Sequence, residues 1–279
     1  MVLRALRACS SVLLCTALPL LAAERNDLPS CYEFARLSQH RPSPSGRELE
    51  IVIDQTVQLP KELQESVYSH VLRYIKPGDT VRLYQFSAYL PGNYMKLMYT
   101  GQLEGALDNE VRDDIGMNSL HQLDRCLARQ VAFFRKTLGQ RLVESFAKPG
   151  EDIPKSEIFF SLKQIGEDIA QRSAPNKVML LVSDMLENSD FGSFYADNKI
   201  RSIDPIAELK KVEQKDLFAD LGGARVYVMA AGLVPTTAKH GYRAGSTVQK
   251  LEIFWNSYFR HSNAQMIKFG APLLTVDLQ

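Results

Sequence analysis

Residues 48–54 of this 279-residue chain, Glu-Leu-Glu-Ile-Val-Ile-Asp, decide the fold. A β-branched apolar centre is typical of a strand buried in the middle of a sheet, and here the run ends in a carboxylate at Asp54. Residues 177–184, Lys-Val-Met-Leu-Leu-Val-Ser-Asp, repeat the pattern and end at Asp184. The sequence thus predicts two buried strands that each end in an aspartate.

Helical stretches alternate with these and other predicted strands. Apolar residues recur every four positions from Leu63 to Ile75, which indicates an amphipathic helix. Further strands are predicted at residues 81–87, 94–99 and 224–230, and further helices at residues 117–146, 158–169, 205–212 and 248–262. This alternation predicts an α/β fold with a doubly wound, mostly parallel sheet and helices on both faces.

The two aspartates form a candidate site. In an open α/β sheet, ligands bind beyond the carboxyl ends of the strands, near the reversal in strand order. Asp54 and Asp184 are both predicted at such ends. Two carboxylates supplemented by hydroxyl groups suit a hard divalent cation. Alternatively, Asp54 simply caps the helix that follows it.

The residues around both aspartates resemble one known family. Residues 54–58, Asp-Gln-Thr-Val-Gln, are similar to the Asp-x-Ser-x-Ser motif of the von Willebrand factor A (vWA) family. Residues 182–185, Val-Ser-Asp-Met, resemble its later strand, which ends in Thr-Asp-Gly or Ser-Asp-Gly, and residues 156–162 fit its Thr-x-Ile-x-x-Ala-Leu helix start. The resemblance covers roughly residues 48–270 and implies a vWA-like, Rossmann-like fold.

The resemblance also implies a degenerate metal-ion-dependent adhesion site (MIDAS). Its ligand set would be Asp54, Thr56, Gln58, Ser156 and Asp184. These residues would hold Mg²⁺, or Mn²⁺ or Ca²⁺, and the cation would accept a carboxylate from a partner protein. The third motif position is Gln58 rather than the family's Ser. Glu187 and Asp190 are expected on the partner-binding rim.

The first residues predict export. Arg4 and Arg7 precede an uncharged run at residues 8–23, which is short for a membrane span of ~20 residues. We interpret residues 1–23 as a signal peptide, which predicts a periplasmic or secreted protein; a leader that is retained as a membrane anchor is the alternative. Residues 24–47 are an N-terminal segment with a Pro-rich linker. Residues 48–279 form the vWA-like domain, with a helical insertion at about 101–155.

Charge and cysteine content support this assignment. Without the two leader arginines, 31 basic residues face 32 acidic ones. No long basic run appears, which disfavours nucleic-acid binding. Beyond the leader only Cys31 and Cys126 remain. They suggest a single disulfide in an oxidising compartment, with two separate thiols as the alternative.

We therefore expect an exported protein-binding module with a protein partner, no enzymatic activity and no small organic cofactor. A phosphoryl-transfer hydrolase similar to the haloacid dehalogenase-like enzymes is one alternative. Those enzymes carry a second acid two residues after the nucleophile, where this chain has Thr56, so a general acid is missing. A metal-free structural subunit of an envelope complex is another alternative.

Overall fold

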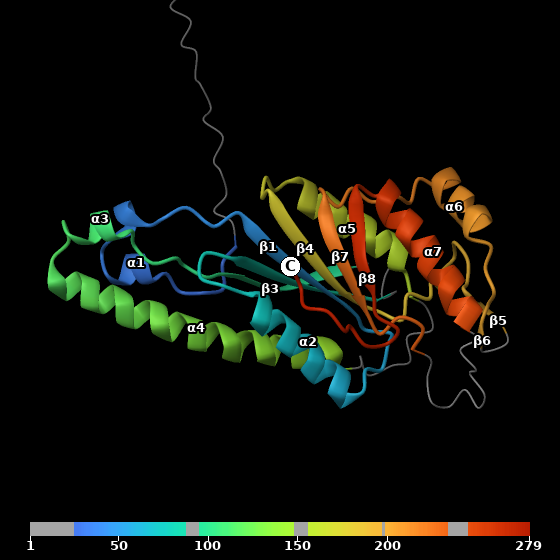
Figure 1. The fold of residues 1–279 in the computed structure, drawn as a ribbon, viewed down its shortest axis with the longest axis horizontal. Coiled ribbons are helices and arrows are strands. Elements are labelled where there is room, and N and C mark those ends of the chain that lie inside the picture. The colour runs from blue at the N-terminus through green and yellow to red at the C-terminus, as the bar shows by residue number, and fades with distance from the viewer. Residues whose placement is uncertain (1–24, 88–94, 148–155, 197–198, 234–244) are drawn as a thin grey trace, which may run out of the picture.

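A six-stranded sheet organises the chain (Figure 1). The structure is a computed structural model that describes residues 25–87, 95–147, 156–196, 199–233 and 245–279. The strand order is β3-β2-β1-β4-β7-β8. The strands are β1 (Arg47–Asp54), β2 (Thr80–Phe86), β3 (Met95–Gln102), β4 (Asn176–Val182), β7 (Ala224–Met229) and β8 (Ala264–Phe269). Only β3, at one edge, runs antiparallel to its neighbour.

The strand order reverses between β1 and β4. The chain leaves β1 for β2 and β3 on one side and returns to β4 on the other. β1 and β4 pair in parallel, with Ile51 opposite Leu180. Their carboxyl ends therefore lie together at the position where α/β sheets bind ligands. The predicted doubly wound, mostly parallel α/β fold is confirmed.

Helices cover both faces of the sheet. They are α2 (Lys61–Tyr74), α4 (Met117–Phe146), α5 (Ile158–Ala170), α6 (Pro205–Gln214) and α7 (Gly245–His261). The odd-numbered residues of β1, such as Ile51, pack with α2 and α4, and Val52 packs with α5, α6 and α7. This alternation follows from the two-residue repeat of a strand. Ile51, Val52 and Ile53 thus meet apolar residues on both faces, which explains the apolar run in the second half of β1.

The N-terminal segment packs on the end of α4 that projects beyond the sheet (Figure 1). α4 is one continuous 30-residue helix in the predicted 101–155 region. Short elements complete the chain: α1 (Cys31–Phe34), the 3₁₀ helix η1 (Ser38–His40), α3 (Asn109–Arg112), and the ribbon of β5 (Tyr195–Ala196) and β6 (Lys199–Ile200). Cys31 of α1 and Cys126 of α4 form the predicted disulfide, with Cα atoms 5.4 Å apart.

The predicted signal peptide, residues 1–23, lies outside the described residues. Within the described ranges, no helix combines the length and the apolar character that crossing a bilayer requires.

Candidate functional site

Asp54 is the hub of the site. It is the last residue of β1 and is 1% exposed. Its Oδ1 accepts hydrogen bonds from the Thr56 backbone N–H (3.0 Å) and the Thr56 hydroxyl (2.6 Å). Its Oδ2 accepts from the Ser183 hydroxyl (2.8 Å) and the Ser156 hydroxyl (3.2 Å). Three segments that are distant in the sequence thus converge on one carboxylate.

Asp184 lies beside this hub, just beyond the end of β4. Its Oδ1 accepts from the Leu186 backbone N–H (2.9 Å), and its Oδ2 accepts from the Tyr195 hydroxyl (2.7 Å). Tyr195 belongs to β5, which lies between the predicted strand at residues 177–184 and the predicted helix at residues 205–212, where the sequence predicts neither helix nor strand. Its role at the site was not predicted, because an isolated tyrosine in a polar loop carries no recognisable motif.

Burial dominates the electrostatics of the aspartate pair. It raises the pKa of Asp54 above its usual range, against the effect of the Thr56 and Ser183 hydrogen bonds. It also raises the pKa of Asp184, to about 8, and the neighbouring Asp54 charge adds to that rise. Two buried carboxylates close together oppose each other's ionisation. A bound cation would offset both the desolvation and this repulsion.

The donor atoms present fit a hard divalent cation. Two carboxylates and three hydroxyls supply only oxygen, the ligand type that Mg²⁺ prefers. Of the predicted ligands, the structure brings together Asp54, Thr56, Ser156 and Asp184, and it adds Ser183. The described residues contain no group of three or more His, Cys, Asp or Glu side chains arranged to hold a metal. A cation here would depend on the hydroxyls.

Gln58 does not join this group. It is exposed, and none of the described contacts of Asp54 involves it. Its neighbours Val57 and Leu59 are both buried in the core. The segment around Gln58 is thus fixed by apolar contacts on either side of it, and the Gln58 side chain faces solvent. The structure therefore gives no support to Gln58 as a ligand.

The prediction that Glu187 lies on an exposed rim is wrong. Its side chain is fully buried, and its Oε2 accepts from the backbone N–H groups of Ile158 (2.8 Å) and Phe159 (3.2 Å). The carboxyl group thus satisfies free donors at the N-terminus of α5. Burial raises the pKa of Glu187 to about 8. Asp190, the other predicted rim residue, is exposed.

The same loop positions Ser156. Ser156 and Asn188 exchange backbone hydrogen bonds of 2.9 and 3.0 Å. Together with the Glu187 contacts, this pairing fixes the start of α5 against the segment that follows β4. The Ser156 hydroxyl is therefore held toward Asp54 by residues that carry no motif of their own.

Met185 occupies the place where the vWA-type motif has glycine. Its φ is +62°, in the left-handed region that glycine adopts most readily. Its side chain is buried, and its carbonyl accepts a 2.9 Å hydrogen bond from the Trp255 indole. Met185 thus has a backbone conformation that favours glycine, the residue that the resembled motif carries at this position.

A buried ionic cluster lies on the α5 side of the sheet and was not predicted. Arg172 donates to Glu48 (3.2 Å), to Glu50 (2.8 Å) and to Asp168 (2.7 Å). Arg82 on β2 forms an ion pair with Glu48 (3.0 Å). Burial raises the pKa of Glu50 to about 7, and the two arginines oppose that rise. The cluster is bonded internally and gives no indication of a ligand.

The known proteins that resemble this chain are solved structures of low sequence identity. No protein-family model and no curated protein matches the chain. The chain is similar to the ArnB paralog VWA2 of Sulfolobus acidocaldarius (14% identity, 67% of this chain and 35% of that one, TM-score 0.30). It is similar to an aerotolerance-related membrane protein of Bacteroides fragilis (14% identity, 80% of this chain and 91% of that one, TM-score 0.35). It is also similar to the pilus adhesin SpaC of Lactobacillus rhamnosus GG (11% identity, 68% of this chain and 25% of that one, TM-score 0.33). The chain thus spans about a third of the first protein and a quarter of the third.

Proposed function

We propose that this chain is an exported, vWA-like protein-binding module that recognises a partner carboxylate through a divalent cation. The observation that supports this most is the convergence of the Thr56, Ser156 and Ser183 hydroxyls on Asp54, beside Asp184. This group lies at the carboxyl ends of β1 and β4, where the strand order reverses.

In this proposal Asp54, Asp184, Thr56 and Ser156 hold the cation, with Ser183 beside them. The bound cation supplies the positive charge that attracts the partner's carboxylate. Tyr195 orients the Asp184 carboxyl through its hydroxyl. Glu187 fixes the start of α5, and with it Ser156. The cation is Mg²⁺, or Mn²⁺ or Ca²⁺, because all the donor atoms are oxygens.

The Cys31–Cys126 disulfide supports the export part of the proposal. Disulfides persist in oxidising compartments and are rare in the reducing cytosol. Together with the leader-like residues 1–23, the disulfide favours a periplasmic or secreted location.

Calorimetric titration with MgCl₂ and MnCl₂ tests the cation site. The wild type is expected to give saturable heat and a higher melting temperature in the presence of the metal. Asp54→Asn keeps the shape of the side chain but removes its charge, so it should lose both effects. Gln58→Ala is the matched control at an exposed motif position and should retain both. Absence of heat and of stabilisation in the wild type would leave the metal-free structural subunit as the better account.

A phosphoryl-transfer hydrolase is less well supported. Asp54 is buried and already accepts four hydrogen bonds, which makes it a poor nucleophile. The Thr56 hydroxyl donates to Asp54 and does not act as an acid toward a leaving group. Turnover of p-nitrophenyl phosphate by the wild type, lost in Asp54→Asn, would favour the hydrolase instead.

A further inference from the structure

A cavity of about 880 Å³ lies between α1 and α4, on the part of α4 that extends beyond the sheet. It is remote in the fold from the Asp54 site, and the proposed function makes no use of it. The residues that line it are Pro29, Ser30, Phe34, Ala35, Arg36, Ser119, Gln122, Arg125, Cys126 and Arg129. Its volume is in the range of protein ligand sites.

The lining of this cavity is electropositive. Arg36, Arg125 and Arg129 all contribute to it, and none of its lining residues is acidic. Within the described ranges, none of these three arginines forms an ion pair with another residue. The Arg125 Nε–H donates only to the His121 carbonyl, at 3.1 Å.

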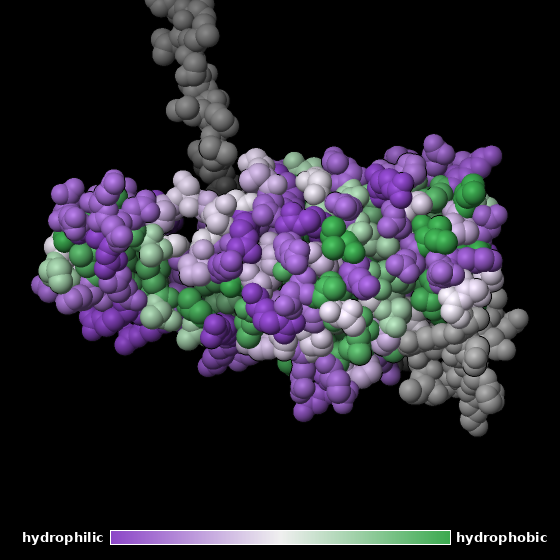
Figure 2. Space-filling view, viewed as in Figure 1, coloured by the Kyte–Doolittle hydropathy of each residue, from purple (hydrophilic) through white to green (hydrophobic). Residues whose placement is uncertain are grey.

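Two carboxylates near this end of the molecule pair with arginines outside the cavity lining. Asp124 accepts two hydrogen bonds from Arg112 (3.0 and 2.7 Å), and Glu33 forms an ion pair with Arg41. Hydrophilic residues dominate the projecting end, with apolar ones between them (Figure 2). Phe34, which is 66% exposed, supplies an apolar wall next to the arginines.

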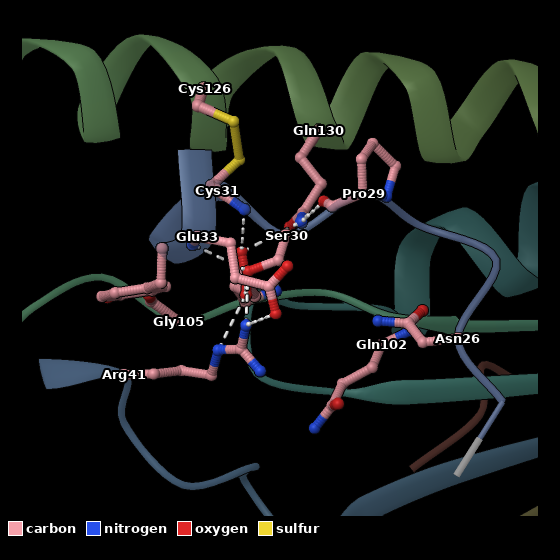
Figure 3. Close-up of polar contacts among 12 residues, drawn as sticks. Asn26, Pro29, Ser30, Cys31, Glu33, Arg41, Gln102, Gly105, Cys126 and Gln130 are labelled. Carbon is pink, nitrogen blue, oxygen red and sulfur yellow. Dashed lines mark hydrogen bonds and ion pairs between the residues drawn. A yellow bond between two sulfur atoms is a disulfide. The ribbon is translucent and has the colours of Figure 1, made fainter. Parts of the chain in front are cut away.

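The cavity is rigidly built. The Cys31–Cys126 disulfide joins its two helices directly (Figure 3). Behind it, the buried Glu104 carboxylate accepts from the Cys31 backbone N–H (2.6 Å) and the Ser30 hydroxyl (2.8 Å). Gln130 of α4 donates to the Pro29 carbonyl at 2.9 Å. These bonds hold α1 against α4, so the cavity walls are organised before any ligand arrives.

We propose that this cavity binds an acidic peptide segment of a partner protein. Guanidinium groups pair with carboxylates through two parallel hydrogen bonds, and the cavity is lined by three arginines that form no ion pair with any residue the structure describes. The apolar Phe34 wall suits a peptide that carries apolar residues between its acidic ones. A nucleic acid fits this cavity less well, because the lining carries three arginines rather than the long basic stripe that a phosphate backbone requires.

Fluorescence anisotropy with labelled hexaglutamate tests this proposal on the full mature chain. The wild type should bind saturably at low salt and more weakly at ~0.15 M salt, because exposed charges are screened. The double variant Arg125→Glu/Arg129→Glu, and separately Arg36→Glu, should weaken binding on the order of tenfold. The control Arg135→Glu/Lys136→Glu makes the same charge change at exposed positions on α4 outside the cavity and should retain wild-type affinity. Unchanged melting temperatures establish that each variant is folded.

Four outcomes would overturn the proposal. They are no saturable binding by the wild type, an equal loss of affinity in the control variant, equal or tighter binding of a single-stranded oligonucleotide, and complete displacement of the peptide by inorganic phosphate at the peptide's own concentration. The first two outcomes exclude a specific site, and the last two assign the site to another anion. Asp54→Asn should bind hexaglutamate as the wild type does, so a failure here is distinguishable from a failure of the cation site.

Discussion

The Ser183 hydroxyl donates a 2.8 Å hydrogen bond to Asp54 Oδ2 and so ties the end of β4 to the end of β1. The same hydroxyl oxygen accepts from the Met185 backbone N–H at 2.9 Å. Ser183 is fully buried, so no water can replace it without rearrangement. The bond therefore fixes the geometry of the candidate site and the turn after β4 together.

Ser183→Ala should lower the free energy of unfolding by ~1–3 kcal/mol, because it leaves a buried carboxylate with one donor fewer. Urea unfolding followed by circular dichroism measures the change. Thr56→Val removes another hydroxyl donor to Asp54, but Thr56 is partly exposed and water can take its place. It should therefore cost less, and a larger loss in Thr56→Val would contradict this assignment.

The buried Glu187 carboxyl predicts a pH-dependent stability. Its pKa is about 8 in the folded protein and 4.5 in its unperturbed state. Between these values the folded state holds a proton that the unfolded chain releases. The free energy of unfolding should then fall as the pH rises from about 4.5 to about 8, and stay level above that. The neighbouring Glu157 charge acts in the same direction.

Glu187→Gln tests this prediction, because a glutamine is neutral at every pH and can still accept from the start of α5. Its stability should decline less than that of the wild type between pH 5 and 8, as measured by urea unfolding at each pH. Asp190→Asn, at an exposed position in the same loop, should follow the wild-type curve. Parallel curves for all three proteins would show that Glu187 does not carry the extra proton.

Periodicity was sufficient to predict the central strands of the sheet and its covering helices. β1, β2, β4 and β7 follow the predicted strand stretches, because each carries an apolar run that a central strand requires. β8 was missed, since Ala-Gln-Met-Ile-Lys-Phe at the sheet edge is largely exposed or half-buried and gives a weak pattern. α4 has the bounds of the predicted helix at residues 117–146, but its packing was not predicted: Phe134 and Leu138 pack with the sheet, whereas its N-terminal part packs with α1.

The candidate site was predictable only where a motif exists. Asp54, Thr56 and Asp184 follow from strand ends and family resemblance. Tyr195 donates to Asp184 from a segment in which the sequence shows no helix or strand periodicity. Glu187 lies in the same segment, where a charged side chain is expected to be exposed, although it accepts from the N-terminus of α5. Such contacts depend on the path of the loop in space, which local sequence does not determine.

Arg172 neutralises buried carboxylates, so its loss should be severe. Arg172→Met removes the 2.8 Å bond to Glu50, which is fully buried, and raises the pKa of Glu50 above about 7. We expect a loss of up to ~3–5 kcal/mol, because among the described residues the buried Glu50 then keeps only Arg82, at 3.8 Å, as a cationic partner. Adding Glu50→Gln should recover part of it. Arg141→Met, which breaks an exposed pair with Glu144, should leave the free energy of unfolding nearly unchanged; equal effects at both sites would refute the role of burial.

Substitutions of Met185 distinguish the effect of backbone strain on stability from the effect of side-chain packing. Its φ of +62° suits glycine, whereas its side chain is fully buried in the core. Met185→Ala and Met185→Gly both delete that side chain and should both destabilise the protein, by ~2–5 kcal/mol. Glycine relieves the left-handed backbone and alanine does not, so the Gly variant should be the more stable of the two by ~1 kcal/mol. Urea unfolding of the pair measures that difference directly. The opposite order would mean that the loss of backbone entropy in glycine outweighs the strain, and that the glycine of the vWA motif is not required by the turn after Asp184.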